Sequence, residues 1–230
     1  MFILLSVAIA PALALLSYFY LRKEIAKEPS RLLLHTFIYG AILTFPILFI
    51  QHVIQEEQVI SGLFVRNALF SSTLEEFFKW LALLVAIYKH VEFDDPYDGI
   101  LYGASVSLGF ATVENILFLL NFGMHDAFMR ALLPVSSHAL FGVVMGYYLG
   151  RAKFSTLNKS RYEITYALAA PLVLHIIYNS ILIFTGFELI LMVPFMLFLW
   201  VFGLSKVKKA HILSHKRRYE HHEYFIREEI

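Results

Sequence analysis

Two adjacent glutamates and a lysine lie inside an apolar stretch of the sequence. The segment SSTLEEFFKW, Ser71–Trp80, places Glu75, Glu76 and Lys79 on consecutive helical turns. Ten Leu, Ile, Phe or Val residues between Asn67 and Tyr88 favour membrane insertion by about 3 to 6 kcal/mol, whereas three central charges oppose it by about 7.5 to 10 kcal/mol. The charges must therefore face protein or a water-filled pocket, and an intramembrane ionisable residue predicts a functional site.

The three charges share one face of the predicted helix with Ser71 and Ser72, at about 100° per residue. Lys79 follows Glu75 by four residues and Glu76 by three, so it can pair with either carboxylate and leave the other free. Such a pair can supply one ionised group as a base and one protonated group as an acid. A structural ion pair is the other interpretation, but it requires only one carboxylate.

Three further apolar segments carry polar side chains. Each is weak evidence alone, because a single intramembrane histidine or asparagine often forms a helix–helix hydrogen bond. Counted from the predicted segment ends at about 1.5 Å per residue, however, Glu75, Glu114, His138 and His175 all lie roughly 10–14 Å below the same membrane surface. The segments are GFATVENILF with Glu114 and Asn115, SSHALFGVVMGYYLG with His138, and HIIYNS with His175 and Asn179.

Carboxylates and imidazoles around a water-accessible pocket suit general acid–base hydrolysis of a peptide bond, with the histidines as oxyanion donors. No cofactor is required for this chemistry. A zinc site built from His138, His175 and a glutamate stays open, because two His and one Glu form a catalytic zinc set. The sequence contains no HExxH, GxSG or GxGD motif, which argues against the zinc, serine and aspartyl intramembrane proteases that use those motifs.

Two other functions fit isolated features. Intramembrane carboxylates and histidines also form proton relays in transporters, although a transporter predicts polar groups through both membrane halves and paired interrupted helices. Small residues at helical spacing, among them Gly142 and Gly146 of the fifth segment and Gly103 of the fourth, predict that these two helices approach closely. A non-catalytic scaffold would instead bind partner helices through such residues. We keep both as alternatives to hydrolysis.

The whole chain has the composition of a multi-pass membrane protein. Of its 230 residues, 59% are hydrophobic and 16% charged, and the mean hydropathy is +0.66, whereas an average globular protein is about half apolar and a quarter charged. Cysteine is absent, which excludes disulfides, thiolate metal sites and a cysteine nucleophile. The net charge of +1 indicates no nucleic-acid partner.

Seven stretches approach the roughly 20 apolar residues that a spanning helix needs. We therefore predict an all-α fold of about seven transmembrane helices, with one transmembrane domain over residues 1–204 and a basic, solvated cytoplasmic tail over residues 205–230. The stretches are Phe2–Leu21, Leu32–Ile50, Asn67–Tyr88, Gly99–Leu120, Ala131–Leu149, Ile164–Phe184 and Leu189–Leu204.

Lysine and arginine are concentrated in the first loop, the loop after the fifth stretch and the tail. All three lie on one side of a seven-span topology, so the positive-inside rule predicts an outside N-terminus and a cytoplasmic C-terminus. The basic part of the tail is expected to contact anionic membrane lipid. The loop Lys89–Asp98 on the same side is acidic, but acidic residues have little weight in this rule.

Four segments in order resemble the PrsW intramembrane proteases: EEFFKW, GASVSLGFATVENILF, the SSHALFGVVMGYYLG histidine and HIIYNS. That family is distantly similar to the CAAX prenyl proteases with their EExxxR, FxxxH and HxxxN/D-type motifs. The resemblance covers nearly the whole chain. It implies a glutamic-type or metal-assisted peptidase of the bacterial cytoplasmic membrane, which makes the first, extracytoplasmic cut in the single-span anti-sigma factor RsiW and so starts the release of an envelope-stress sigma factor.

The resemblance also implies roles for individual residues. The family motif has Asp or Asn four residues after its late histidine, so Asn179 is expected to form hydrogen bonds rather than carry a proton. Carried over residue by residue, the catalytic glutamates are Glu75 and Glu76, the late histidine is His175, His138 and Glu114 match the other two motif positions, and Lys79, Asn115 and Asn179 have supporting roles.

Overall fold

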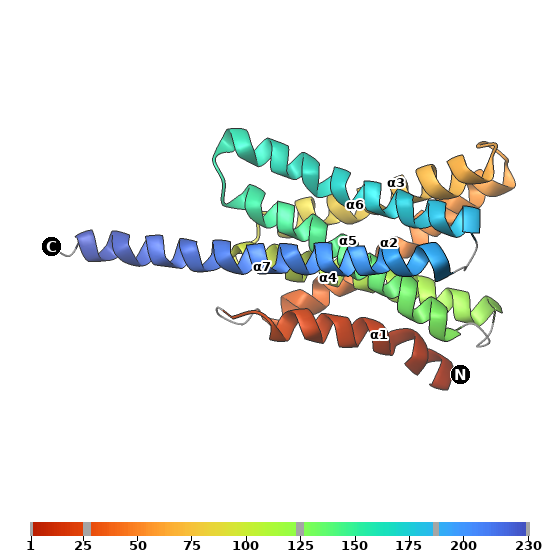
Figure 1. The fold of residues 1–230 in the computed structure, drawn as a ribbon, viewed down its shortest axis with the longest axis horizontal. Helices are drawn as coiled ribbons and strands as arrows, with labels where there is room; N and C mark the ends of the chain where they lie inside the picture. Colours follow the sequence, from red (N-terminus) through yellow and green to blue (C-terminus); the bar gives the residue numbers. More distant parts are fainter. Residues whose placement is uncertain (1, 25–28, 123–126, 186–188, 229–230) are drawn as a thin grey trace.

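The fold is a bundle of long helices (Figure 1). The computed structural model describes residues 2–24, 29–122, 127–185 and 189–228. These residues form helices and no strands, which confirms the predicted all-α class. In chain order the helices are α1 (Phe2–Leu21), α2 (Ser30–Glu56), η1 (Phe64–Ser71), α3 (Ser72–Ala82), η2 (Leu83–Ile87), α4 (Pro96–Phe122), α5 (Ala127–Lys153), α6 (Leu157–Thr185) and α7 (Leu189–Glu228).

Among the described residues, five helices are long and apolar enough to span a membrane, namely parts of α1, α2, α4, α6 and α7. Helix α5 and the continuous path η1–α3–η2 complete the seven helical segments that the sequence predicts. Large apolar side chains of α2, such as Leu34, Phe45 and Phe49, are exposed, as expected for a surface that faces lipid. The start of α1 and the end of α7 lie towards opposite ends of the bundle (Figure 1).

Helix α4 is the buried helix against which its neighbours pack, and all residues from Leu101 to Phe110 are buried. Its contact with α5 depends on glycine. A Cβ atom on Gly103 would collide with the carbonyl oxygen of Gly142, and one on Gly146 with that of Gly99. The close approach predicted from the small-residue stripe of α5 is therefore confirmed. It fixes the relative positions of the polar residues that α4 and α5 carry.

Two π-helical segments, η1 and η2, flank α3. A π-turn has i→i+5 hydrogen bonds and often occurs at functional sites; here the Tyr88 N–H donates to the Leu83 carbonyl over 2.8 Å. At the other end, the side-chain amide of Asn179 on α6 donates to the Asn67 carbonyl of η1 over 3.2 Å. The bond from Asn179 ties η1, and with it the start of α3, to α6.

The predicted faces of α3 are confirmed. Its polar side chains Ser72, Glu75, Glu76 and Lys79 are all buried, whereas Phe77 is exposed. The charges that oppose membrane insertion are thus paired inside the protein, and the apolar side chains of α3 cover them from the outside.

Buried charges also close the bundle at the end of α1. Lys23 Nζ lies 2.5 Å from Asp98 Oδ1, and both side chains are buried. The other oxygen of Asp98 accepts the backbone N–H groups of Asp94 and Asp95 over 3.1 and 2.7 Å, and Ser214 of α7 donates to Asp95 over 2.5 Å. The acidic loop that we predicted from composition therefore joins α1, α4 and α7.

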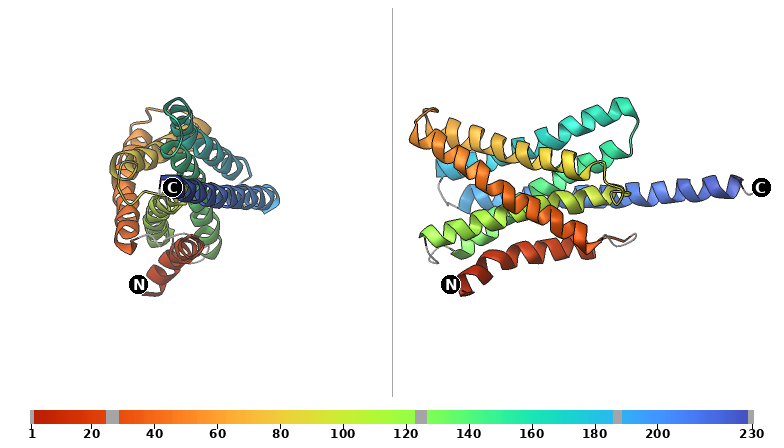
Figure 2. Two further views of the ribbon diagram at one scale, coloured as in Figure 1. Left: turned by 90° about the vertical axis from the view of Figure 1, so that its left-hand side faces the viewer. Right: turned by 180° about the vertical axis from the view of Figure 1, so that it is seen from behind.

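Helix α7 does not end near residue 204. Its 40 residues span about 60 Å at 1.5 Å per residue, and the helix continues past its neighbours (Figure 2). Val207, Ala210 and Ser214 are buried, so the first part of the predicted tail packs against the bundle instead of being solvated. Small and apolar residues at helical spacing explain this packing. Side chains beyond Glu220 lie outside those described.

Candidate active site

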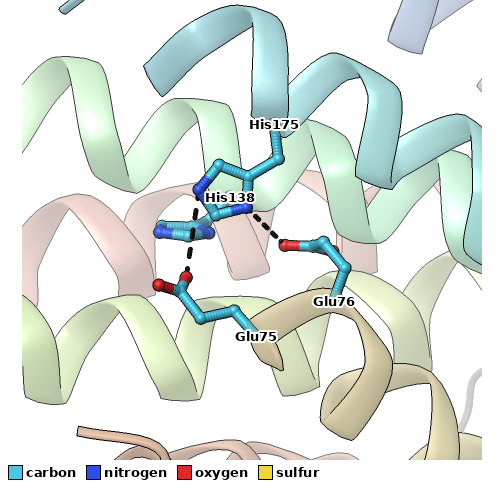
Figure 3. A group of neighbouring side chains, drawn as sticks. All are labelled: Glu75, Glu76, His138 and His175. Carbon is cyan, nitrogen blue, oxygen red and sulfur yellow. Dashed lines mark hydrogen bonds and ion pairs between the residues drawn. The ribbon is translucent and has the colours of Figure 1, made fainter. Parts of the chain in front are cut away.

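Four ionisable side chains from three helices meet in the bundle core: Glu75 and Glu76 of α3, His138 of α5 and His175 of α6 (Figure 3). None is more than 5% exposed. One oxygen or nitrogen atom from each lies within 4.8 Å of the others. The structure thus brings together the four residues that the sequence predicts as catalytic.

Glu76 fixes the orientation of His175. Glu76 Oε1 lies 2.9 Å from both Lys79 Nζ and His175 Nδ1. An ionised carboxylate only accepts hydrogen bonds, so this contact assigns the His175 proton to Nδ1. His175 Nε2 then faces Glu75, with 3.9 Å to Glu75 Oε2 (Figure 3). A carboxylate that holds the far nitrogen of a reacting imidazole is a common supporting arrangement.

His138 links Lys79 to Glu114. Its Nδ1 lies 3.1 Å from Lys79 Nζ, and its Nε2 lies 3.1 Å from Glu114 Oε2. Lysine only donates, so Nδ1 accepts and Nε2–H donates to Glu114. Lys79 is fully buried, and its ammonium lies 4.1 Å from the centre of the Phe110 ring. Lys79 is therefore the buried countercharge of this network, and Glu114 is its outer end.

Glu75 is held from a helix that the sequence did not implicate. Its Oε1 accepts a hydrogen bond from Gln51 Nε2 of α2 over 3.0 Å, and its Oε2 lies 3.9 Å from Lys79 Nζ. Sequence reasoning missed Gln51 because the predicted second segment ended at Ile50. A single uncharged amide at a segment end carries no signal of its own.

Two cavities meet at Glu75. The first has a volume of about 260 Å³ and the second, between α2, η1 and α6, about 330 Å³; Glu75, Asn179 and Leu182 line both. Glu76 and Lys79 line neither. Of the two adjacent glutamates, Glu75 is therefore the one that solvent and a ligand can reach. The first cavity also contains Glu114, Asn115, His138 and His175, and the second contains Gln51, Gln55 and Arg66.

The two asparagines have different surroundings. Asn179 donates to Ser72 Oγ over 2.9 Å, and Ser72 lies one helical turn before the two glutamates on α3. Asn115 donates to the Ala8 carbonyl over 3.1 Å and so joins α4 to α1. Asn179 is thus part of the wall that positions α3, and the amide of Asn115 is used in helix packing.

The cluster fits a zinc ion in kind and in spacing. Imidazole nitrogens and carboxylate oxygens bind Zn²⁺ at about 2.0–2.2 Å, which places the donors of one ion roughly 3–4 Å apart. Glu75 Oε2 and His175 Nε2 are 3.9 Å apart. Among the described residues, Glu75 Oε2 and Glu76 Oε2 are buried and accept no hydrogen bond. Both could bind an ion without losing a partner, whereas His138 would have to release Lys79 or Glu114.

Comparisons with known proteins match one family over most of the chain. Residues 28–203 match the model of the PrsW family intramembrane metalloproteases. The chain is 52% identical over 211 residues to "Protease PrsW" of Bacillus subtilis, which covers 91% of this chain and 96% of that protein. The protein of the same name from Oceanobacillus iheyensis is 51% identical over 208 residues, which are 90% of this chain and 95% of that protein. The one from Clostridioides difficile is 28% identical over 220 residues, which are 92% of this chain and 92% of that protein.

No solved structure gives a significant match. The family match extends over the helices that carry the cluster, and the relatives are matched over almost their whole length. The chain therefore belongs to the PrsW family of intramembrane metalloproteases and is a multi-pass peptidase of the bacterial cytoplasmic membrane.

Proposed function

We propose that this chain makes the first, extracytoplasmic cut in a single-span anti-sigma factor similar to RsiW, so that further proteolysis releases an envelope-stress sigma factor. Membership of the PrsW family supports the reaction class. One structural observation supports the site: Glu75 lines both cavities that meet at the buried cluster. A peptide bond placed at that junction would have room for the substrate chain on either side.

In the proposed mechanism, Glu75 is the general base. It takes a proton from water as the water oxygen attacks the peptide carbonyl carbon, and it returns that proton to the amine when the C–N bond breaks. His175 faces Glu75 through Nε2. Because Glu76 accepts the Nδ1–H of His175, the ring is held with Nε2 at the reacting centre, and in its doubly protonated form it donates Nε2–H to the developing oxyanion.

The remaining residues position this pair. Lys79 provides the positive charge opposite Glu76, and His138 holds Lys79 and Glu114 while its ring lies perpendicular to that of His175 at 5.1 Å. Asn179 keeps its hydrogen bond to Ser72. A Zn²⁺ held by Glu76, His138 and His175 would leave Glu75 free as the base and would add Lewis-acid polarisation of the peptide carbonyl.

We also propose that the N-terminus is outside the cell and the C-terminus is cytoplasmic, from the distribution of Lys and Arg. The absence of cysteine makes this orientation simple to test. On intact cells, a membrane-impermeant maleimide is expected to label a Glu57→Cys variant, and to label Asn158→Cys only after the cells are opened. The reverse pattern would contradict the orientation and would place the cluster in the cytoplasmic half of the membrane.

Co-expression with a doubly tagged anti-sigma factor tests the substrate. The wild-type chain is expected to remove the extracytoplasmic tag, and the Glu75→Gln variant to leave it in place. A matched substrate, with its extracytoplasmic segment next to the membrane replaced by Gly and Ser residues, is expected to stay intact. Equal cutting of both substrates, or of neither, would argue against an anti-sigma factor as the target.

Gln51→Leu is expected to lower kcat about tenfold or more, because a hydrogen bond to a charged group contributes about 1.5–3 kcal/mol. The loss of this bond frees Glu75 to move within the cavity. Gln55→Leu is the matched control, since Gln55 lines the same cavity one helical turn later. Steady-state cleavage kinetics measure both variants, and an equal effect on the two would show that Gln51 only fills space.

A further inference from the structure

A second group of charged side chains surrounds a cavity at the other end of the bundle, where α5, α6 and α7 come together. The cavity has a volume of about 420 Å³. Its lining residues come from the start of α4, the end of α5, the short connection to α6, the start of α6 and the extended part of α7. Four of them are basic, namely Arg151, Lys159, Lys216 and Arg217, and one is acidic, Glu220.

The cavity carries an excess of positive charge. Arg151 is paired with Glu163 over 2.6 Å, and Lys216 lies 3.7 Å from Glu220 on the same exposed helix face. Arg217 stacks on the Phe154 ring, with 3.7 Å to its centre. Within the described part of the chain, no carboxylate pairs with Lys159 or with Arg217, so two positive charges in one cavity are left unneutralised.

The positive-inside rule alone does not explain this arrangement. That rule places basic residues on the cytoplasmic side but does not bring them together in space. Lys208 and Lys209 of the same helix are exposed and do not line the cavity. In contrast, the four cavity residues converge from three separate segments of the chain.

Exposed tyrosines close to the cavity in the sequence indicate the level of the membrane interface. On α6, Lys159 is followed by Tyr162 and Tyr166, which are 70% and 54% exposed. Tyrosine is enriched where the hydrocarbon region meets the lipid head groups. Lys159 is therefore placed where a head-group phosphate would be, and the hydroxyl group of Thr156, which also lines the cavity, is a further donor.

We propose that this cavity binds the phosphate group of an anionic phospholipid. Basic pockets between transmembrane helices on the cytoplasmic side are suited to such head groups. The bound phosphate, with its single negative charge, would pair with both Lys159 and Arg217 and so join the ends of α5, α6 and α7. Helices α5 and α6 carry His138 and His175, so the lipid would stabilise the packing of the helices that hold the cluster. The proposal does not depend on which reaction the cluster performs.

Lipid binding to the detergent-purified full chain tests the proposal. Native mass spectrometry and thermal unfolding are measured with phosphatidylglycerol, with phosphatidylcholine and with inorganic phosphate. Phosphatidylglycerol is expected to bind and to raise the Tm, whereas phosphatidylcholine has little effect. The Lys159→Gln/Arg217→Gln variant is expected to bind phosphatidylglycerol about thirtyfold more weakly, because each basic residue near a membrane surface contributes about fivefold.

Lys208→Gln/Lys209→Gln is the matched control, because it removes the same charge from the exposed part of α7. Near-normal phosphatidylglycerol binding by this control supports the proposal. An equal loss in the two variants would overturn it in favour of diffuse attraction, and equal binding of the two lipids would overturn it because the site would then not select an anionic lipid. Inorganic phosphate could raise the Tm as much as the lipid does, with the effect lost only in Lys159→Gln/Arg217→Gln. This result would support a site for an anion and overturn the proposal that the anion belongs to a lipid. A charge-keeping Lys159→Arg/Arg217→Lys variant must retain binding; if it does not, shape rather than charge explains the loss.

Discussion

Glu75→Gln is expected to lower the rate of substrate cleavage by about 10²- to 10⁴-fold, the usual contribution of a positioned general base, while the protein stays folded. The amide keeps the shape of the side chain, and its oxygen can still accept the hydrogen bond from Gln51. It cannot take a proton from water. Cleavage rates in proteoliposomes and the Tm of the purified variant measure the two effects separately.

Glu76→Gln is the informative comparison for that prediction. Glu76 Oε1 accepts from both Lys79 and His175, and neither cavity reaches this side chain. Its substitution is therefore expected to lower the Tm as well as the rate. If Glu75→Gln cleaved at a near-normal rate while Glu76→Gln was stable and inactive, the two glutamates would have the opposite roles.

Lys79→Met is expected to lower the free energy of unfolding by about 3–5 kcal/mol, the usual cost of leaving a buried charge without its partner. Lys79 is fully buried, with Glu76 at 2.9 Å and Glu75 at 3.9 Å. Removing the ammonium leaves two carboxylates close together in the core. Denaturant unfolding in detergent measures the loss.

A second substitution separates charge from shape in that prediction. The double variant Glu76→Gln/Lys79→Met removes the buried pair as a unit, and it is expected to recover most of the stability but none of the activity. Replacing a whole buried ion pair is often nearly neutral. A double variant as unstable as Lys79→Met would mean that packing of the lysine side chain, and not its charge, supports the fold.

Much of the fold followed from hydropathy and helical periodicity. Apolar stretches of spanning length predicted seven helical segments, and the buried polar face of α3 followed from the spacing of Glu75, Glu76 and Lys79. The small residues Gly142 and Gly146 correctly indicated the close contact of α5 with α4. These patterns are local, so they can be found without knowing which helices are neighbours.

Other features depend on contacts between distant segments. The π-helical segments on either side of α3 have no distinctive composition. The Lys23–Asp98 pair joins residues 75 positions apart, and a buried pair of this kind looks like two ordinary loop charges in the sequence. The sequence predicted a solvated tail for the packed part of α7 because basic residues surround the buried Val207 and Ala210 there.

The site was predictable as a set of residues but not as a network. Equal depth in the membrane indicated that Glu75, Glu114, His138 and His175 would converge, and the distances agree with this. Depth says nothing about which glutamate lines a cavity, and that distinction came from the packing of α2 and α6 around Glu75. Membership of a peptidase family also removes the need for the transporter and scaffold alternatives.

The most direct test of the proposed chemistry is the mass of the products formed by purified components. The wild-type chain and a single-span anti-sigma factor are reconstituted in proteoliposomes made with H₂¹⁸O. If Glu75 activates the water, the wild-type chain produces two fragments whose masses add up to the substrate plus one water, with ¹⁸O in the new carboxyl terminus. The Glu75→Gln variant produces no fragments. The same labelled fragments from Glu75→Gln would contradict the assignment of Glu75 as the base, and an intact substrate with the wild-type chain would contradict the proposed substrate.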